Sequence, residues 1–375
     1  MGSPKPVFGT VVIAGVGLIG GSVALGLRER FLASEIIGFD LEPSVLSEAL
    51  GMGVIDRAEL SLGAWLESAD LVILAVPVRV LPALAEDLAR FAGSKTVFTD
   101  VGSVKGALLE GLASLPFEFR QRFVAGHPMA GSEKGGVRHA SASLLQNAIW
   151  VLTPSLENRA ESIERVRLLI DSLGAKSVIL DARAHDRLVA MVSHLPYLSA
   201  LALTRLVARH EDRDGLALLA AGGFRDLTRV ASGDPTMSRD MVVENRTALR
   251  EALSRYRAEL ESLEAMLFAP EMLLEAAFEG KRTRDSLPVV KRSLLPILYD
   301  VVVALADKPG EFAKVATLMG GANLNIKDVE VLTNREQGGS MRLGFASLDE
   351  AQAARTVLEQ AGFVARARKI GRAHV

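Results

Sequence analysis

The chain has 375 residues, with 43 Lys and Arg against 45 Asp and Glu, six His and no Cys. A net charge of −2 favours neither nucleic acid nor an anionic membrane, and the missing cysteines exclude disulfides and thiolate sites. We therefore predict a small-molecule partner or a second copy of the chain, and no metal. No signal peptide is recognised and no apolar run reaches the roughly 18 residues of a membrane span, so a cytoplasmic protein is expected.

The first chemical signature follows a short apolar run at 11–14. Gly15-Val16-Gly17-Leu18-Ile19-Gly20 has the spacing G-x-G-x-x-G. In this pattern the first glycine allows a tight turn, the second lets the backbone approach a pyrophosphate, and the third lets a helix pack closely on the strand. The glycines alone are also typical of an ordinary strand-to-helix turn.

An acidic residue strengthens the dinucleotide interpretation. Asp40 ends a second apolar run, twenty residues after Gly20, where a carboxylate would bind the ribose hydroxyls of NAD and repel the 2′-phosphate of NADP. We therefore predict NAD. The predicted cofactor contacts are Gly15, Gly17, Leu18, Ile19, Gly20, Asp40, Val76 and Pro77.

Strand and helix signals alternate as far as Asp181. Apolar runs at 71–76, 96–99, 149–152 and 178–180 predict further strands, and the pattern at 163–173 predicts an amphipathic helix. Residues 1–181 are therefore predicted to form an α/β domain of the Rossmann type. Ligands of such sheets bind beyond the carboxyl ends of the strands.

Two segments at predicted strand ends carry the candidate chemistry. Ser103 is equally consistent with capping the next helix and with contacting a ligand, and Lys105 is consistent with a solvated lysine. His127, between Gly126 and Pro128, stands in a predicted loop with little apolar periodicity. This favours proton chemistry over a core histidine, with Glu133 as a candidate partner.

Residues 182–283 are predicted to form an all-helical domain. Six residues on one long helix follow a heptad seam, which must be buried against another helix in the same domain or in a second copy; we favour a homodimer. They are Leu249, Leu253, Tyr256, Leu260, Leu263 and Leu267. The segment 222–229, with Asp226 and Arg229, has the composition of a solvated loop, although arginine suits a carboxylate ligand.

A charged segment at 281–292, with Pro288, predicts a linker, which we place at 284–294. Residues 295–370 begin with a predicted strand at 299–305, the turn Asp307-Lys308-Pro309-Gly310 and a helix. Strands near 326–332 and 341–345 follow. A second helix, started by Ser347-x-x-Glu350, and a last strand near Phe363 complete the segment. The order βαββαβ predicts a ferredoxin-like domain of two helices on an antiparallel sheet.

Together these motifs resemble the prephenate dehydrogenase family of tyrosine biosynthesis, in the form with a C-terminal ACT domain. The resemblance covers nearly the whole chain and implies NAD-dependent oxidative decarboxylation of prephenate to 4-hydroxyphenylpyruvate. It rests on Gly15-x-Gly17-x-x-Gly20-Gly21-Ser22, Asp100-Val101-Gly102-Ser103-Val104-Lys105, His127-Pro128-Met129-Ala130-Gly131-Ser132-Glu133, Ser193-His194-Leu195-Pro196, Gly223-Phe224-Arg225-Asp226-Leu227-Thr228-Arg229 and Asp307-Lys308-Pro309-Gly310.

The resemblance assigns a catalytic role to two residues. His127 would accept the proton of the ring hydroxyl, for which a neutral histidine near the reference pKa of about 6.5 is well suited. Ser103 would bond the same hydroxyl or orient His127.

The resemblance also implies how the substrate is held. Arg229 would bind a substrate carboxylate and His194 the other polar groups, while Glu133 and Asp226 would restrain these cations. Ser238 stands where many relatives carry tryptophan, which implies a different pocket shape on that side.

An ACT domain implies paired modules that bind an amino acid. Tyrosine is the expected effector, near Gly310, with Asn323 and Asn325 as neighbours. A purely structural module is the alternative.

Three other functions fit parts of the sequence. Arogenate dehydrogenase differs only in the amino group of its substrate. A hydroxyacid dehydrogenase of the 6-phosphogluconate type generally uses a lysine of the helical domain, whereas the candidate histidine here lies on the sheet domain. A non-catalytic amino-acid sensor would not need intact glycines together with Asp40, His127 and Arg229.

Overall fold

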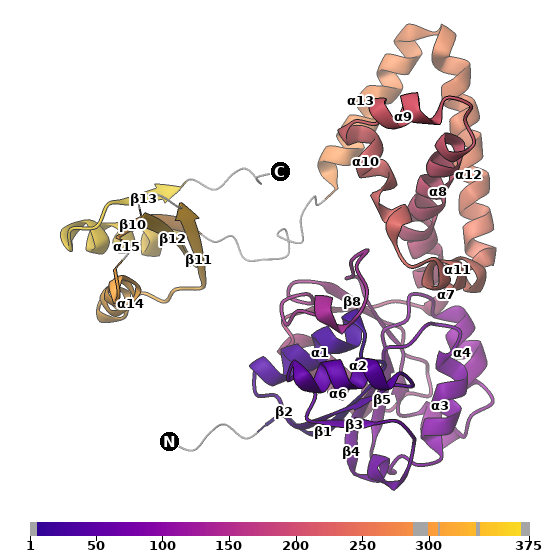
Figure 1. The fold of residues 1–375 in the computed structure, drawn as a ribbon, viewed down its shortest axis with the longest axis horizontal. Coiled ribbons are helices and arrows are strands. Elements are labelled where there is room, and N and C mark those ends of the chain that lie inside the picture. The colour runs from indigo at the N-terminus through magenta and orange to yellow at the C-terminus, as the bar shows by residue number, and fades with distance from the viewer. Residues whose placement is uncertain (1–5, 288–298, 307, 335–337, 369–375) are drawn as a thin grey trace. The chain divides into compact units, whose positions relative to one another are not determined.

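The computed structural model describes residues 6–287, 299–306, 308–334 and 338–368. The chain forms two compact units, Met1–Arg284 and Asp285–Val375 (Figure 1). The first unit contains a sheet part and a helical part. The second is a small sheet with two helices.

The sheet part is built on six parallel strands in the order β3-β2-β1-β4-β5-β6. The strand order reverses between β1 (Phe8–Ala14) and β4 (Ala69–Leu74), which places the ligand crevice there. This confirms the predicted Rossmann-type domain. The other elements are α1 (Leu18–Glu29), β2 (Ala33–Phe39), α2 (Pro43–Gly51), β3 (Arg57–Glu59), η1 (Ala64–Ser68), α3 (Leu81–Ala89), β5 (Val97–Asp100), α4 (Gly106–Leu112), α5 (Phe117–Arg120) and β6 (Phe123–Val124).

The six-stranded sheet is buried on both faces. Val11 and Ile13 of β1 belong to one hydrophobic cluster, while the alternating Val12 and Ala14 belong to another. Successive side chains of a strand point to opposite faces, so a sheet covered by helices on both sides requires a continuous apolar run. The continuous apolar runs in the sequence therefore reflect the burial of both faces of the sheet.

A second sheet of three strands carries the candidate histidine. Its order is β7 (Gly126–Pro128), β8 (Ile149–Leu152) and β9 (Lys176–Ile179), with η2 (Val137–His139) and α6 (Ala160–Ser172) in the connections. His127 pairs with Val151 in an antiparallel ladder, so the loop predicted at this point is wrong. A strand of three residues is too short to show a periodic pattern.

The helical part follows without a strand. Its elements are α7 (Ala182–Val189), the π-helix η3 (Ala190–His194), α8 (Leu195–Ala208), α9 (Arg213–Leu219), α10 (Gly222–Thr228), η4 (Arg229–Ser232), α11 (Pro235–Glu244), α12 (Arg246–Ala265), η5 (Met266–Phe268) and α13 (Pro270–Ser286). Residues 222–229, which have the composition of a loop, are mostly helical. Helix α13 also continues through 281–286, because the charged residues of the predicted linker are good helix formers; linker residues 288–294 lie outside the described residues.

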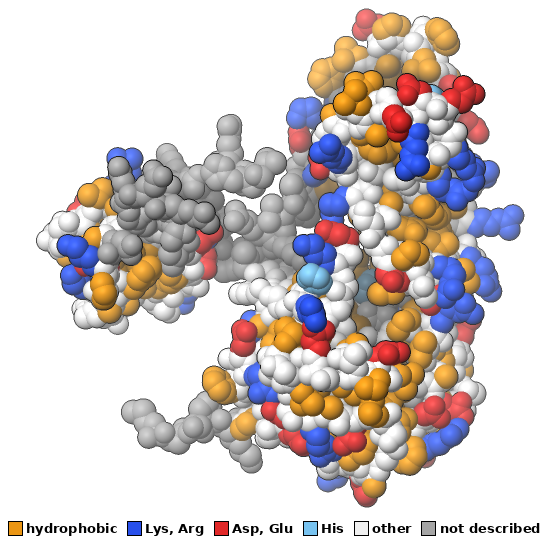
Figure 2. All heavy atoms as spheres, in the orientation of Figure 1, with side chains coloured by type: hydrophobic (Ala, Val, Ile, Leu, Met, Phe, Trp, Pro, Cys, Tyr) orange, Lys and Arg blue, Asp and Glu red, His pale blue; other side chains and the backbone are white. Residues whose placement is uncertain are grey.

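The heptad seam of α12 is covered at one end only. Leu249 is 2% exposed, whereas Leu260 is 46% exposed and Leu267, just beyond the helix, is 64% exposed. Figure 2 shows hydrophobic side chains on the surface where α12 leads into α13. The first unit therefore buries the beginning of the seam and leaves its end open.

In the part of the chain that the structure describes, one helical run, Ala182–Ala208, is long enough to cross a membrane and contains a window of 18 residues that is apolar enough, with a mean hydropathy of 1.2. The prediction that no apolar run reaches this length is therefore wrong for this segment. The run carries His185, Asp186 and His194, all buried polar side chains. The start of the run, α7, contacts α4 of the sheet part, while α8 contacts other helices, and these three side chains contribute to the candidate site.

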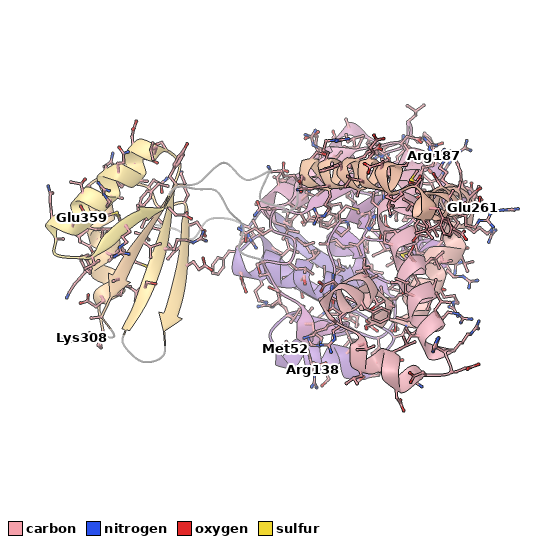
Figure 3. The ribbon with its side chains drawn as sticks, turned by 90° about the horizontal axis from the view of Figure 1, so that it is seen from above. Met52, Arg138, Arg187, Glu261, Lys308 and Glu359 are labelled. Carbon is pink, nitrogen blue, oxygen red and sulfur yellow. The ribbon has the colours of Figure 1, made fainter. Side chains whose placement is uncertain are left out.

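The second unit has the predicted order βαββαβ. Its four strands pair antiparallel in the order β11 (Asp328–Asn334), β12 (Gly338–Phe345), β10 (Tyr299–Leu305) and β13 (Ala365–Arg368), with helices α14 (Glu311–Gly321) and α15 (Leu348–Gln360). Alternate residues of β10 and β12 pack with both helices in one core. In Figure 3, Lys308 marks the turn before α14 and Glu359 the end of α15. Asp307 of that turn lies outside the described residues, as do 295–298 and 369–370.

Candidate active site

The glycine-rich turn fits a dinucleotide at each of its three glycines. Gly15 has a φ of 95°, and a Cβ there would lie 2.5 Å from the carbonyl oxygen of Ala75. A Cβ on Gly20 would collide with the carbonyl oxygen of Gly15, whereas a Cβ on Gly17 would meet open space. The backbone of Gly17 is therefore the exposed point of the turn.

Helix α1 begins at Leu18 directly after this turn. Its N-terminus receives no hydrogen bond from a capping side chain, so the first N–H groups, including those of Leu18 and Ile19, are available to an anion. A pyrophosphate fits this position. Val76, half-buried, and Pro77, exposed, follow β4 at the point where the strand order reverses.

Asp40 is fixed beside the same turn. One carboxylate oxygen accepts the N–H of Val16 at 3.0 Å and the other accepts the N–H of Glu42 at 3.0 Å. Each oxygen keeps a further lone pair, so the carboxylate can also accept the hydroxyls of a ribose. The residues of this crevice therefore fit NAD.

His127 is the first member of a chain of three hydrogen-bonded side chains. Its Nδ1 lies 2.9 Å from Nε2 of His185, and Nδ1 of His185 lies 2.8 Å from a carboxylate oxygen of Asp186. Asp186 also accepts the N–H of Lys105 at 2.9 Å and that of Gly106 at 2.7 Å. Burial alone would raise the pKa of Asp186, but the hydrogen bonds from His185 and from these two N–H groups lower it.

The ionised Asp186 fixes the proton positions along the chain. A carboxylate only accepts, so His185 donates from Nδ1, and the tautomer with its proton on that nitrogen accepts at Nε2. His127 must then donate from Nδ1. The lone pair of His127 is consequently on Nε2, which is the nitrogen left to accept a proton from a ligand.

The pKa of His127 lies well below 6.5, not near its reference value as the sequence interpretation assumed. Burial is the main cause, and Lys105, His185 and His194 add electrostatic repulsion. His127 is therefore neutral at neutral pH and below it. A neutral imidazole is the form that accepts a proton.

Lys105 is fully buried, so the interpretation as a solvated lysine is wrong. Its Nζ donates to a carboxylate oxygen of Asp100 at 2.5 Å and to the carbonyl of Gly126 at 2.6 Å. Asp100 in turn accepts the N–H of Gly126 at 3.0 Å. These bonds hold β7, and with it His127, at the carboxyl end of β5; a buried lysine with two such partners avoids an unpaired charge.

Ser103 does not cap α4. The helix begins at Gly106, and its first N–H groups are bound by Asp186, which lies 80 residues further along the chain. Ser103 is half-buried in the segment between β5 and α4. The capping role predicted for Ser103 is therefore wrong, and contact with a ligand or with His127 stays a prediction.

His194 ends the π-helix η3. Leu195 donates its N–H to the carbonyl of Ala190, five residues back, and Pro196 has no N–H with which to continue the α-helical pattern. His194 is fully buried, and its Nδ1 lies 3.0 Å from the amide nitrogen of Asn245. Burial lowers the pKa of His194 to about 4, with Asp186 opposing the shift and His185 adding to it.

Arg229, at the start of η4, forms an ion pair with Glu133, in the segment after β7. Nη1 of Arg229 lies 2.9 Å from a carboxylate oxygen of Glu133, and both side chains are accessible to solvent. Asp226 points to solvent from α10, and in the described parts of the chain it forms no ion pair with Arg229 or His194. The geometry therefore supports a restraining role for Glu133 and does not support one for Asp226.

The sequence interpretation missed His185, Asp186 and Asn245. A signal was present for the first two, because a histidine and an aspartate stand together at the start of a helix that follows a strand. Asn245, between α11 and α12, had no local signal.

Comparison with known proteins places the chain in one family. Family profiles described as the nucleotide-binding and the dimerization domain of prephenate dehydrogenase match residues 23–179 and 181–273. The prephenate dehydrogenase of Bacillus subtilis (strain 168) is 32% identical over 355 residues, which is 93% of this chain and 95% of the relative.

Solved structures of prephenate and arogenate dehydrogenases are also similar to this chain. Prephenate dehydrogenase from A. aeolicus, in complex with hydroxyphenyl propionate and NAD⁺, has a TM-score of 0.70 and 33% identity over 74% of this chain and 98% of that chain. Synechocystis arogenate dehydrogenase has a TM-score of 0.63 and 30% identity over 74% and 99%. The chain thus belongs to the prephenate dehydrogenase family and is an NAD-dependent oxidoreductase.

Proposed function

We propose that this protein oxidises and decarboxylates prephenate to 4-hydroxyphenylpyruvate in tyrosine biosynthesis, in the cytoplasm. The observation that carries the proposal is the chain Asp186–His185–His127, which leaves Nε2 of His127 as a proton acceptor at the carboxyl end of the NAD-binding sheet. Oxidation of an alcohol needs such an acceptor beside the cofactor.

The residues would act as follows. His127 accepts the ring-hydroxyl proton at Nε2, while Ser103 hydrogen-bonds the same oxygen. NAD⁺, which Gly15, Gly17, Gly20 and Asp40 would hold, would supply the acceptor for the hydride of the carbinol carbon. The electron pair of the bond to the ring carboxylate then enters the ring, carbon dioxide leaves, and His127 returns the proton to the phenolate oxygen. Aromatisation supplies the driving force, so positioning is the main task of the protein.

Arg229 would release the carboxylate of Glu133 and bind a carboxylate of the substrate. It is paired with Glu133 and largely exposed, so a substrate carboxylate can replace Glu133 as its partner. Glu133 would then act as a gate, and His194 would contact the side chain of the substrate. Replacing one accessible ion pair by another costs little, because such pairs contribute weakly to stability.

We also propose a homodimer and regulation by tyrosine. The open end of the α12 seam supports the dimer. The βαββαβ topology of the second unit supports an ACT module, with Gly310 in the left-handed conformation before α14. Asn323 and Asn325 lie beyond the other end of α14, about 16 Å away at 1.5 Å per residue, so a site that includes all three residues needs a second copy of the module.

Arogenate is the alternative substrate, and the similarity to an arogenate dehydrogenase favours testing it. Purified protein should form NADH with prephenate, with a higher kcat/KM than with arogenate, and tyrosine should reduce the rate. An inactive but folded, NAD-binding preparation would contradict the proposed reaction. Equal rates with and without tyrosine would contradict only the regulatory part.

A further inference from the structure

His194 carries a buried polar atom without a partner. Its side chain is fully enclosed, and in the described part of the molecule its Nε2 has no hydrogen-bond partner. Leaving such an atom unpaired is unfavourable, because the hydrogen bond to water that it loses on burial is not replaced. A ligand atom that bonds to Nε2 would remove this cost, so the chemistry of that nitrogen bears on which ligand is preferred.

Asn245 determines that chemistry. Its Nδ2 lies 2.8 Å from the carbonyl oxygen of Asp186 and 3.0 Å from Nδ1 of His194. The reversed amide would set an oxygen against that carbonyl oxygen, so the amino group must face both atoms. Nδ1 of His194 therefore accepts, and the proton of the neutral ring is on Nε2.

We propose that Asn245 is a specificity-determining residue, which holds His194 as an Nε2–H donor and so favours a substrate side chain with a 2-oxo group over one with a 2-ammonium group. This inference rests on the proposed function and names the substrate class of the same site. The oxygen of the 2-oxo group accepts the Nε2–H bond. An ammonium has only donors, so it would face the N–H with no lone pair and would leave it unsatisfied.

A change in the protonation state of His194 does not readily release it from this arrangement. The groups that interact with it are His127, His185, Asp186 and Asn245. A second proton on the ring would have to be placed on Nδ1, against the amino group of Asn245. The ring is thus held in a single neutral form, which presents a donor to the ligand.

The test compares the two substrates in two variants. Asn245→Leu keeps the size of the side chain but removes the donor, so His194 can take either tautomer. We expect the ratio of kcat/KM for prephenate to that for arogenate to fall about 10-fold, the equivalent of one hydrogen bond. Asn158→Leu is the matched control, since Asn158 also donates from Nδ2 to two backbone carbonyls, those of Arg120 and Phe123, and should leave the ratio unchanged.

A second measurement does not depend on activity. In the full-length wild-type protein labelled with ¹⁵N-histidine, the His194 signals, assigned with His194→Asn, should show a protonated Nε2 and an unprotonated Nδ1 at neutral pH. In Asn245→Leu the two nitrogens should shift towards intermediate values. Binding of 3-(4-hydroxyphenyl)propionate, which lacks a 2-substituent, should change less than about twofold, the difference being too small for a lost hydrogen bond.

The outcomes separate the inference from the proposed function. A protein that forms NADH from prephenate, with a substrate ratio that Asn245→Leu leaves unchanged, would overturn the role of Asn245 alone. A wild-type His194 protonated at Nδ1 would do the same, whether or not the variant folds. Formation of NADH from neither substrate would instead overturn the proposed function, and with it the preference for an oxo acid.

Discussion

The sheet part and the helical part of the first unit differ in how fully they bury their own apolar side chains. The sheet part buries apolar clusters on both faces of its sheet, whereas the cluster specific to the helical part has only four buried residues, Ala190, Leu195, Leu249 and Ala252. The helical part nevertheless contributes His185, Asp186, His194 and Arg229. The proposed base is thus held on a sheet, while the residues proposed to orient it and to hold the substrate come from helices whose own packing leaves an apolar seam open.

The largest expected effect is a loss of activity on replacing His127 in the sheet part. His127→Asn removes the proton acceptor but keeps a polar side chain of similar size, so kcat should fall by about 10²-fold or more with little change in KM. Steady-state kinetics with prephenate and a titration with NAD would measure this. A change in KM alone would contradict the assignment of His127 as the base.

The open seam gives the next largest effect. Leu260→Glu combined with Leu267→Glu places two charges on a surface that a second copy would bury, so the dimer should weaken by about 10²-fold or more. Sedimentation over a range of concentrations would show it. The exposed Phe31 of the sheet part is the control position, since Phe31→Glu should leave the assembly unchanged. A dimer that persists in the double variant would place the interface elsewhere.

Asp186 joins the two parts, and its replacement should have an intermediate effect. Asp186→Asn replaces the acceptor-only carboxylate by an amide that can accept from or donate to His185, so the proton positions of His185 and His127 are no longer fixed. We expect kcat to fall about 10- to 100-fold. The amide oxygen can still cap α4, so a normal melting temperature with reduced kcat would separate orientation from stability. Unchanged kcat would show that His127 does not need the chain.

The smallest effect is a dependence of stability on pH. The pKa of His194 is lowered from 6.5 to about 4, so between these values the unfolded chain binds more protons than the folded one. The contribution of His194 to stability should be complete above pH 6.5 and fall by at most about 3 kcal/mol as the pH approaches 4. Urea unfolding at several pH values would detect the loss. His194→Asn should reduce it, whereas replacement of the exposed His139 should not.

Local patterns in the sequence were sufficient for some features. The glycine spacing, the apolar strands and Asp40 predict the Rossmann-type domain because a turn, a buried strand and its end each depend on a few neighbouring residues. The βαββαβ order of the second unit was predictable for the same reason. The strand at His127 was missed because three residues show no periodicity, and Lys105 was misjudged because burial depends on partners such as Asp100 and Gly126, the second of which is 21 residues distant.

The sequence by itself therefore determined the NAD-binding turn, the identity of the candidate base and the resemblance to a family. Only the tertiary structure decided which nitrogen of His127 is free to accept a proton, because His185 lies 58 residues further along the chain and Asp186 binds Lys105 across 81 residues. The same holds for His194, whose proton position depends on Asn245, 51 residues away. The residue type sets which chemistry a side chain can perform. Its hydrogen-bond partners, brought together by folding, decide which of its atoms performs that chemistry.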